Sequence, residues 1–180
     1  MTHTFEHIPG VGQFGLGLVA AILLVVGATR MSAPGRVMRQ RGYSVVDFEL
    51  AGSSAAHARI QAQWGAKGKA AAARSLWADT LFYVPGYAVL ISVIATGCAA
   101  EVGNRIGSGW ADLTRWIAYA ALVAGVLDWI ENGSLALVLK GKLAVGRVAQ
   151  GVARAKFFLI GLALAWVLLV VLPVVAAPGL

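Results

Sequence analysis

Three polar side chains, Asp128, Glu131 and Asn132, interrupt the apolar run Trp116–Leu139. Glu131 and Asn132 follow Asp128 by three and four residues, so on a helix all three share one face. A carboxylate at the centre of a bilayer costs about 2.5–3.5 kcal/mol on insertion scales, so two of them with an amide require an explanation. Such a face could bind a cation, hold a proton or recognise a polar headgroup. The pattern therefore predicts a polar site at membrane depth.

A second set of polar side chains lies in the apolar run Leu76–Ala100. Asp79, Tyr83 and Tyr87 follow one another at intervals of four residues and share one helix face. If the two runs cross the membrane in opposite directions, Tyr83 and Asn132 each lie about 10 Å from the same side. We expect the two sets to converge between neighbouring helices. The candidate ligand- or ion-binding residues are Asp79, Tyr83, Tyr87, Asp128, Glu131 and Asn132.

No lysine or arginine lies inside either run, or inside the other two apolar runs of the chain. Two carboxyl groups three residues apart in a low dielectric should not both ionise without a cation, so we expect Asp128 or Glu131 to be neutral at pH 7. Pro85 and Gly86 are expected to kink their helix beside the site. An alternative interpretation is structural: the polar groups hold helices together, or meet a basic residue on a partner subunit.

The composition is that of a membrane protein. Of 180 residues, 59% are apolar and 13% are charged, and the mean hydropathy is +0.76. Soluble domains have about 45–50% apolar and about 25% charged residues. Four runs reach the ~20 residues that cross a bilayer. They are Val11–Thr29, Leu76–Ala100, Trp116–Leu139 and Phe157–Ala177. We therefore predict an all-α bundle of four transmembrane helices in a single membrane domain, residues 1–180, with Phe157–Ala177 facing lipid.

The basic residues alternate between the two predicted sides of the membrane. Of 15 Lys and Arg, none precedes the first run, eight follow it, two lie between the second and third runs, and five between the third and fourth. Positive charge gathers in cytoplasmic loops, so we expect the cell (inner) membrane, both termini outside and the two basic loops inside. Anionic headgroups are the expected counterions, and nucleic acid is not needed. Because residues 1–10 contain no Lys or Arg, the first run is expected to be a retained anchor.

The long basic loop contains a candidate helix, residues 54–73. Ile60 and Trp64 share a face of it, so we expect an amphipathic helix on the cytoplasmic surface, with Trp64 at headgroup level. The pair Pro34-Gly35 predicts a turn after the first span. Residues 101–112 are rich in glycine and are expected to form the short outer loop.

Several chemistries are excluded or disfavoured. A single cysteine, Cys98, rules out an intramolecular disulfide or a CxxC redox pair. No histidine lies in a predicted span, which excludes haem held by paired histidines. The run Gly10–Gly15 fits GxGxxG but follows no strand. The segment His3–His7 fits HxxEH, yet it lies at a terminus that would not fix metal ligands. We therefore predict no cofactor, no metal and no catalytic residue.

Together, several motifs between residues 45 and 135 carry a resemblance. They are Phe48-Glu49-Leu50-Ala51, Trp64-Gly65, Asp79-x-x-Phe82-x-x-Pro85-x-Tyr87 and Asp128-x-x-Glu131-Asn132. As a set they resemble a family of small bacterial membrane proteins, which implies four helices and no named activity. A four-helix bundle with intramembrane acids is also similar in architecture to the sterol-isomerase and sigma-2 receptor group, although that group's motif has no counterpart in this chain.

Three functions are consistent with these residues. The favoured one is binding or passage of a cation, a proton, or an amphiphile that bears an amine or hydroxyl. The second is an accessory subunit whose acids pair with a basic residue of a partner membrane protein. The third, less favoured, is an enzyme in which a carboxyl group protonates a lipid-like substrate.

Overall fold

The computed structural model describes residues 4–177, and within this range the chain forms helices and no strand. Five of these are long: α1 (Gly10–Arg39), α3 (Ser54–Ala78), α4 (Val84–Ile106), α5 (Ser108–Leu139) and α6 (Gly146–Trp166). The remaining elements are η1 (Thr4–His7), α2 (Val45–Glu49), η2 (Asp79–Tyr83), η3 (Leu143–Val145), η4 (Val167–Val171) and α7 (Leu172–Ala176).

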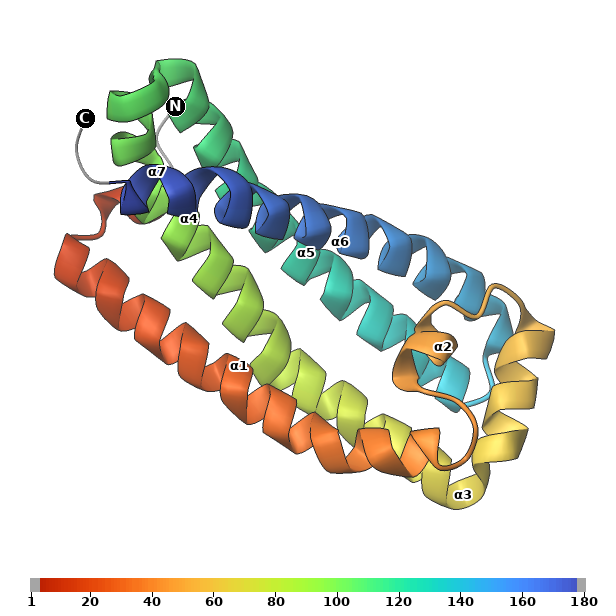
Figure 1. The fold of residues 1–180 in the computed structure, drawn as a ribbon. Coiled ribbons are helices and arrows are strands. Elements are labelled where there is room, and N and C mark those ends of the chain that lie inside the picture. The colour runs from red at the N-terminus through yellow and green to blue at the C-terminus, as the bar shows by residue number, and fades with distance from the viewer. Residues whose placement is uncertain (1–3, 178–180) are drawn as a thin grey trace.

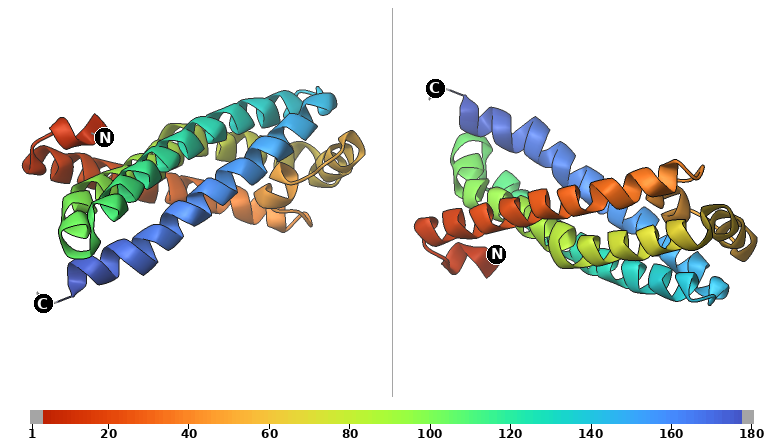
Figure 2. Two further views of the ribbon diagram at one scale, coloured as in Figure 1. Left: turned by 90° about the horizontal axis from the view of Figure 1, so that it is seen from above. Right: turned by 90° about the horizontal axis from the view of Figure 1, so that it is seen from below.

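Four continuous helical stretches are long and apolar enough to cross a membrane. They are Gly10–Arg39, Ser54–Ile106, Ser108–Leu139 and Leu143–Ala176. Each contains one of the four apolar runs, so the prediction of an all-α fold with four such helices is confirmed. α1 packs on α3 and α4, α4 on α5, and α5 on α6, as Figure 1 shows. Both ends of the described chain lie at one end of the bundle, and α2 lies at the other (Figure 2).

Two glycines allow α1 to approach the second apolar helix closely. A Cβ atom on Gly27 would lie 2.6 Å from the backbone nitrogen of Tyr83, and one on Gly86 would lie 2.5 Å from that of Leu24. Any larger residue would push the two backbones apart. This contact fixes the position of α1 beside Tyr83, within the predicted site.

The second apolar helix has an irregular backbone just before Pro85, where Asp79–Tyr83 form the π-helical segment η2; the kink itself stays a prediction. The backbone N–H of Val84 donates to the carbonyl of Asp79, five residues earlier. Proline has no N–H to continue the regular ladder, and a π turn accommodates the change in register. A second π-helical segment, η4, lies just before Pro173. The irregular backbone of the second helix therefore begins at Asp79 itself.

The long helices extend further than the apolar runs that predict them. Pro34-Gly35 lies inside α1 and makes no turn, because the helix continues to Arg39. The outer loop predicted over 101–112 is reduced to Gly107, whose φ of 113° is a conformation that glycine adopts readily. α6 begins at Gly146 instead of Phe157. This third difference brings a basic residue into the bundle.

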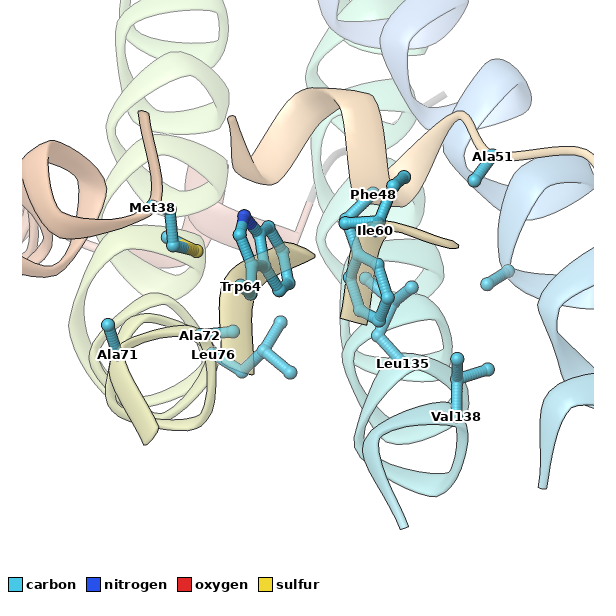
Figure 3. Packing of buried hydrophobic residues seen from close by; sticks show 11 residues of the cluster. Met38, Phe48, Ala51, Ile60, Trp64, Ala71, Ala72, Leu76, Leu135 and Val138 are labelled. Carbon is cyan, nitrogen blue, oxygen red and sulfur yellow. The ribbon is translucent and has the colours of Figure 1, made fainter. Parts of the chain in front are cut away.

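α2 and the first part of α3 cover one end of the bundle. Phe48 and Trp64 lie 4.9 Å apart between ring centroids and pack with Ile60 and Leu135 (Figure 3). The indole nitrogen of Trp64 donates to the carbonyl of Tyr43 over 3.0 Å. Ile60 and Trp64 share a face, but both are buried in protein. Trp64 therefore does not contact lipid headgroups directly, because α2 covers that face, and its depth in a membrane stays a prediction.

The predicted helix 54–73 also differs in its course. Gly65 has φ 59° and ψ −166°, so α3 consists of two helical pieces joined at this residue. The first piece begins at Ser53, whose hydroxyl accepts the N–H of Ala56 and caps the helix. The second piece continues directly through η2 into α4. Gly65 thus allows the piece of α3 before it, which covers the end of the bundle, to lie at a different angle from the piece after it, which continues into α4 (Figure 1).

Candidate functional site

Lys156 is the centre of the buried polar cluster. Its Nζ atom lies 2.7 Å from Asp128 Oδ1, 2.7 Å from Glu131 Oε2 and 4.0 Å from Glu49 Oε2. Only 4% of Lys156 is exposed. The expectation that the acids have no opposite charge from their own chain is therefore wrong. Because Lys156 already supplies a positive charge, the argument that the acids require a cation from outside the chain is weaker.

The position of Lys156 follows from the helical pattern of α6. Its buried residues are spaced three or four apart, or a multiple of that spacing, which defines one face towards α5. They are Gly146, Ala149, Ala153, Lys156 and Ala163. Lys156 precedes the apolar run Phe157–Ala177 by one residue, so it was placed outside the membrane. The stripe of small residues that leads to it is the signal that indicates a buried position.

The six predicted site residues lie in the same region as Lys156. The side-chain amide of Asn132 donates to Asp79 Oδ2 over 2.6 Å, and the Tyr87 hydroxyl donates to Asp128 Oδ2 over 3.0 Å. The ring of Tyr83 lies 5.8 Å from that of Tyr87. The second and third apolar helices therefore bring their polar faces together, as their spacing predicts. Like Lys156, Glu49 belongs to the cluster although the sequence does not predict a site role for it.

The cluster contains more acid than base. Glu49, Asp79, Asp128 and Glu131 are all at most 8% exposed, and among the described residues Lys156 is the cation that pairs with them. If all four carboxyl groups were ionised, the cluster would have a net charge of −3. Such a charge in a low dielectric is costly unless protons or another cation neutralise it. The expectation that Asp128 or Glu131 is neutral at pH 7 therefore stays a prediction.

Two atoms of the cluster have neither a hydrogen-bond partner nor an ion pair within the described residues. Glu131 Oε1 and Asn132 Oδ1 are both buried and unpaired within the described part of the chain. A buried acceptor without a donor costs about 1–3 kcal/mol. Each can accept a bond from a donor that the chain itself does not supply.

Glu49 enters the cluster from outside the four long apolar stretches. It is the last residue of α2, which begins at a capping box: Ser44 Oγ accepts from the N–H of Asp47, and Asp47 Oδ2 accepts from the N–H of Ser44. The Ser44 hydroxyl also donates to Asp47 Oδ2, and this bond together with the one from the Ser44 N–H lowers the pKa of Asp47. Burial raises the pKa of Glu49 to about 8, although the ammonium of Lys156 acts in the opposite direction. Glu49 therefore exchanges its proton near neutral pH.

A cavity of about 470 Å³ adjoins the cluster, between α1, α2, α4 and α6. Most of its lining is apolar, from residues such as Leu24 on α1, Ile94 on α4 and Val167. The polar residues of the lining come from all of the elements that carry the cluster. They are Glu49, Asp79, Tyr83, Tyr87, Asp128 and Lys156. The cavity thus combines an apolar wall with a charged region that has an excess of carboxyl groups.

The weaker motifs find no role in this site. Within residues 4–177, no group of three or more His, Cys, Asp or Glu side chains is arranged to hold a metal ion. His3 of the HxxEH pattern lies outside the described residues, and Glu6 of the same pattern forms an ion pair with Arg115. The run Gly10–Gly15 opens α1 and follows no strand.

Comparison with known proteins adds no assignment. No family model, no curated protein and no solved structure matches this chain. The function must therefore be argued from the geometry of the cluster and its cavity.

Proposed function

We propose that the chain is an integral protein of the cell's inner membrane that binds an amphiphile with an amine headgroup in the cavity between α1 and α6. Both termini would lie outside, with α2 on the cytoplasmic side. Four apolar helices support the membrane location, and the gathering of basic residues near α2 supports the orientation.

The observation that carries this proposal is the division of the cavity lining. An apolar wall of Leu24, Ile94 and Val167 suits an alkyl chain, while Asp79 and Asp128 lie at the charged part of the same cavity. Ligand pockets commonly combine an apolar surface with a few polar groups that fix orientation. An amphiphile can place its alkyl chain against the apolar wall and its polar headgroup beside the carboxyl groups.

The excess of carboxyl groups indicates the sign of the head. Lys156 pairs with Asp128 and Glu131, whereas among residues 4–177 the partner of the Asp79 carboxyl is the amide of Asn132. An alkylammonium head would contribute the positive charge that the cluster lacks, and its N–H groups could donate to the carboxylates. An anionic headgroup would instead increase the excess of negative charge in the cluster.

Two other functions suggested by the sequence receive less support. An accessory subunit was expected to meet a basic residue of a partner, but Lys156 of this chain already supplies such a residue. Passage of a cation or proton would be served better by a continuous polar path, and most of this cavity is apolar. The enzyme alternative has no observation that favours it.

Binding of a matched series of dodecyl compounds tests the proposal. Purified protein in a neutral detergent is titrated with dodecylamine, dodecanol and dodecyl sulfate, with binding followed by calorimetry. We expect dodecylamine to bind most tightly. Asp79→Asn should weaken that binding about 10–100-fold, which corresponds to a charge-assisted hydrogen bond of about 1.5–3 kcal/mol. Asp112→Asn, at the other end of the bundle, is the control and should leave the affinity unchanged.

A second variant tests the apolar part of the cavity. Ile94→Trp should fill the apolar part of the cavity and weaken the binding of all three dodecyl compounds. Ile22→Trp, at an exposed position of α1, should not. Equal binding of the amine and the sulfate, or unchanged binding in both Asp79→Asn and Ile94→Trp, would contradict the proposal. Conversion of a bound amphiphile on incubation would instead favour the enzyme alternative.

A further inference from the structure

A groove with two guanidinium groups lies on the outside of the bundle, between α1 and α3. It has a volume of about 520 Å³, and its lining includes Arg30, Arg74, Trp77 and Leu81. Both arginines are exposed, and none of the described lining residues is acidic. The rest of the wall is apolar. This groove is separate from the carboxyl-rich cavity and has the opposite charge.

A second groove of the same character lies on the other side of Trp77, between α3 and α5. Its volume is about 590 Å³, and its lining includes Lys69, Lys140 and Trp129. Again, no acidic residue appears among the described lining residues. Trp77, which lines both grooves, is 67% exposed. The outer face of α3 thus has an aromatic ridge with a basic, otherwise largely apolar groove on each side.

The two arginines of the first groove lie at different depths. Gly27 packs against the backbone of Tyr83, and α1 runs antiparallel to the α3–α4 stretch (Figure 1). This register places Arg30 about level with Thr80, roughly 9 Å along the helix axis from Arg74. Arginine side chains extend along apolar surfaces towards polar groups, so both guanidinium groups can reach one phosphate between them.

We propose that these two grooves bind phospholipids with anionic headgroups. The phosphate would lie between the two cations of each groove, and an acyl chain would follow the apolar wall. Basic pockets between membrane helices on the cytoplasmic side are sites for anionic lipids, and this end of the bundle carries most of the chain's positive charge. An exposed tryptophan beside the cations is typical of headgroup level. An acidic soluble protein would not need the long apolar wall.

The test compares three variants that each remove two positive charges. They are Arg30→Gln/Arg74→Gln, Lys69→Gln/Lys140→Gln and, as the control, Arg147→Gln/Arg154→Gln. The control residues are exposed, near the same end of the bundle, and line neither groove. Each protein is exchanged into an equimolar mixture of phosphatidylglycerol and phosphatidylcholine with identical chains, and native mass spectrometry measures the retained lipids.

We expect the unmodified protein to retain phosphatidylglycerol in preference to phosphatidylcholine. Each groove variant should lower this preference at least fivefold, because one cation near the membrane surface corresponds to about fivefold in affinity. The control should lower it less than twofold. An equal loss in all three variants would show that net charge alone attracts the lipid and would overturn the proposal. So would an unchanged preference in both groove variants.

A measurement on the unmodified protein protects the test against a variant that fails to fold. Phosphatidylglycerol brominated on its acyl chains should quench tryptophan fluorescence more than brominated phosphatidylcholine does. Trp77→Phe/Trp129→Phe should remove most of this difference, since Trp77 lines both grooves and Trp129 lines the second. Equal quenching by the two lipids, or an undiminished difference in Trp77→Phe/Trp129→Phe, would overturn the proposal.

Discussion

Replacement of Lys156 by methionine should strongly destabilise the protein. Methionine retains much of the volume of lysine but removes the ammonium that lies 2.7 Å from both Asp128 Oδ1 and Glu131 Oε2. Breaking a buried ion pair by the loss of one partner costs about 3–5 kcal/mol, because the remaining charge stays buried without compensation. Here two buried carboxyl groups lose the same partner, so we expect the upper part of this range.

The assay is reversible unfolding in mixed micelles with increasing dodecyl sulfate, followed by circular dichroism. Arg154→Met, an exposed position on the same helix, is the control and should change the stability by less than about 0.5 kcal/mol. The triple variant Lys156→Met/Asp128→Asn/Glu131→Gln should recover most of the loss, because the two carboxyl groups that lie closest to Lys156 are then neutral amides.

The pH dependence provides an independent check of the same reasoning. In Lys156→Met the orphaned carboxyl groups can become neutral only by binding protons. The difference in stability from the unmodified protein should therefore shrink as the pH falls. A loss below about 1 kcal/mol at pH 7, or a triple variant no more stable than Lys156→Met, would refute the idea that this ion pair organises the site.

Three further predictions follow from the packing and the charges. Gly27→Ala should cost about 1–3 kcal/mol because the added Cβ would meet the backbone of Tyr83, whereas Gly133→Ala, which meets nothing within 4 Å, should gain about 0.5–1 kcal/mol; both are read from the same unfolding titration. Tyr87→Phe should cost about 1–3 kcal/mol by leaving a buried carboxylate oxygen without its donor, and Tyr83→Phe should cost less. The pKa of Glu49 is raised from 4.5 to about 8, so its contribution to stability is fully present below about pH 4.5 and is lost as the pH rises to about 8. Glu49→Gln should remove this part of the pH dependence of stability. An unchanged pH dependence in Glu49→Gln would contradict this prediction.

The four apolar helices could be predicted from run length, because a bilayer requires about 20 apolar residues and each run meets that length. Helix ends could not, since length and hydropathy do not say where a helix stops. Pro34 was expected to end α1, yet a proline inside a helix removes one hydrogen bond and can be tolerated. Likewise, Gly107 alone makes a connection that twelve residues were expected to form.

The acids of the site could be predicted from their spacing, whereas Lys156 could not be recognised by hydropathy. A window that begins at Phe157 excludes the lysine by one residue, although Ala149 and Ala153 place it on the buried face of α6. Glu49 presents a different difficulty. It reaches the cluster from a short helix whose position depends on the contacts of Phe48 and Trp64, and no local pattern reports such a tertiary contact.

The most direct test of the central proposal is to identify what occupies the cavity between α1 and α6. The protein is extracted in a mild detergent, denatured in organic solvent, and the released small molecules are identified by mass spectrometry, with Ile94→Trp processed in parallel. We predict an amphiphile with a basic nitrogen, present in near-stoichiometric amount with the unmodified protein and lost from Ile94→Trp. Only bulk phospholipid, in equal amount in both proteins, would contradict the proposal.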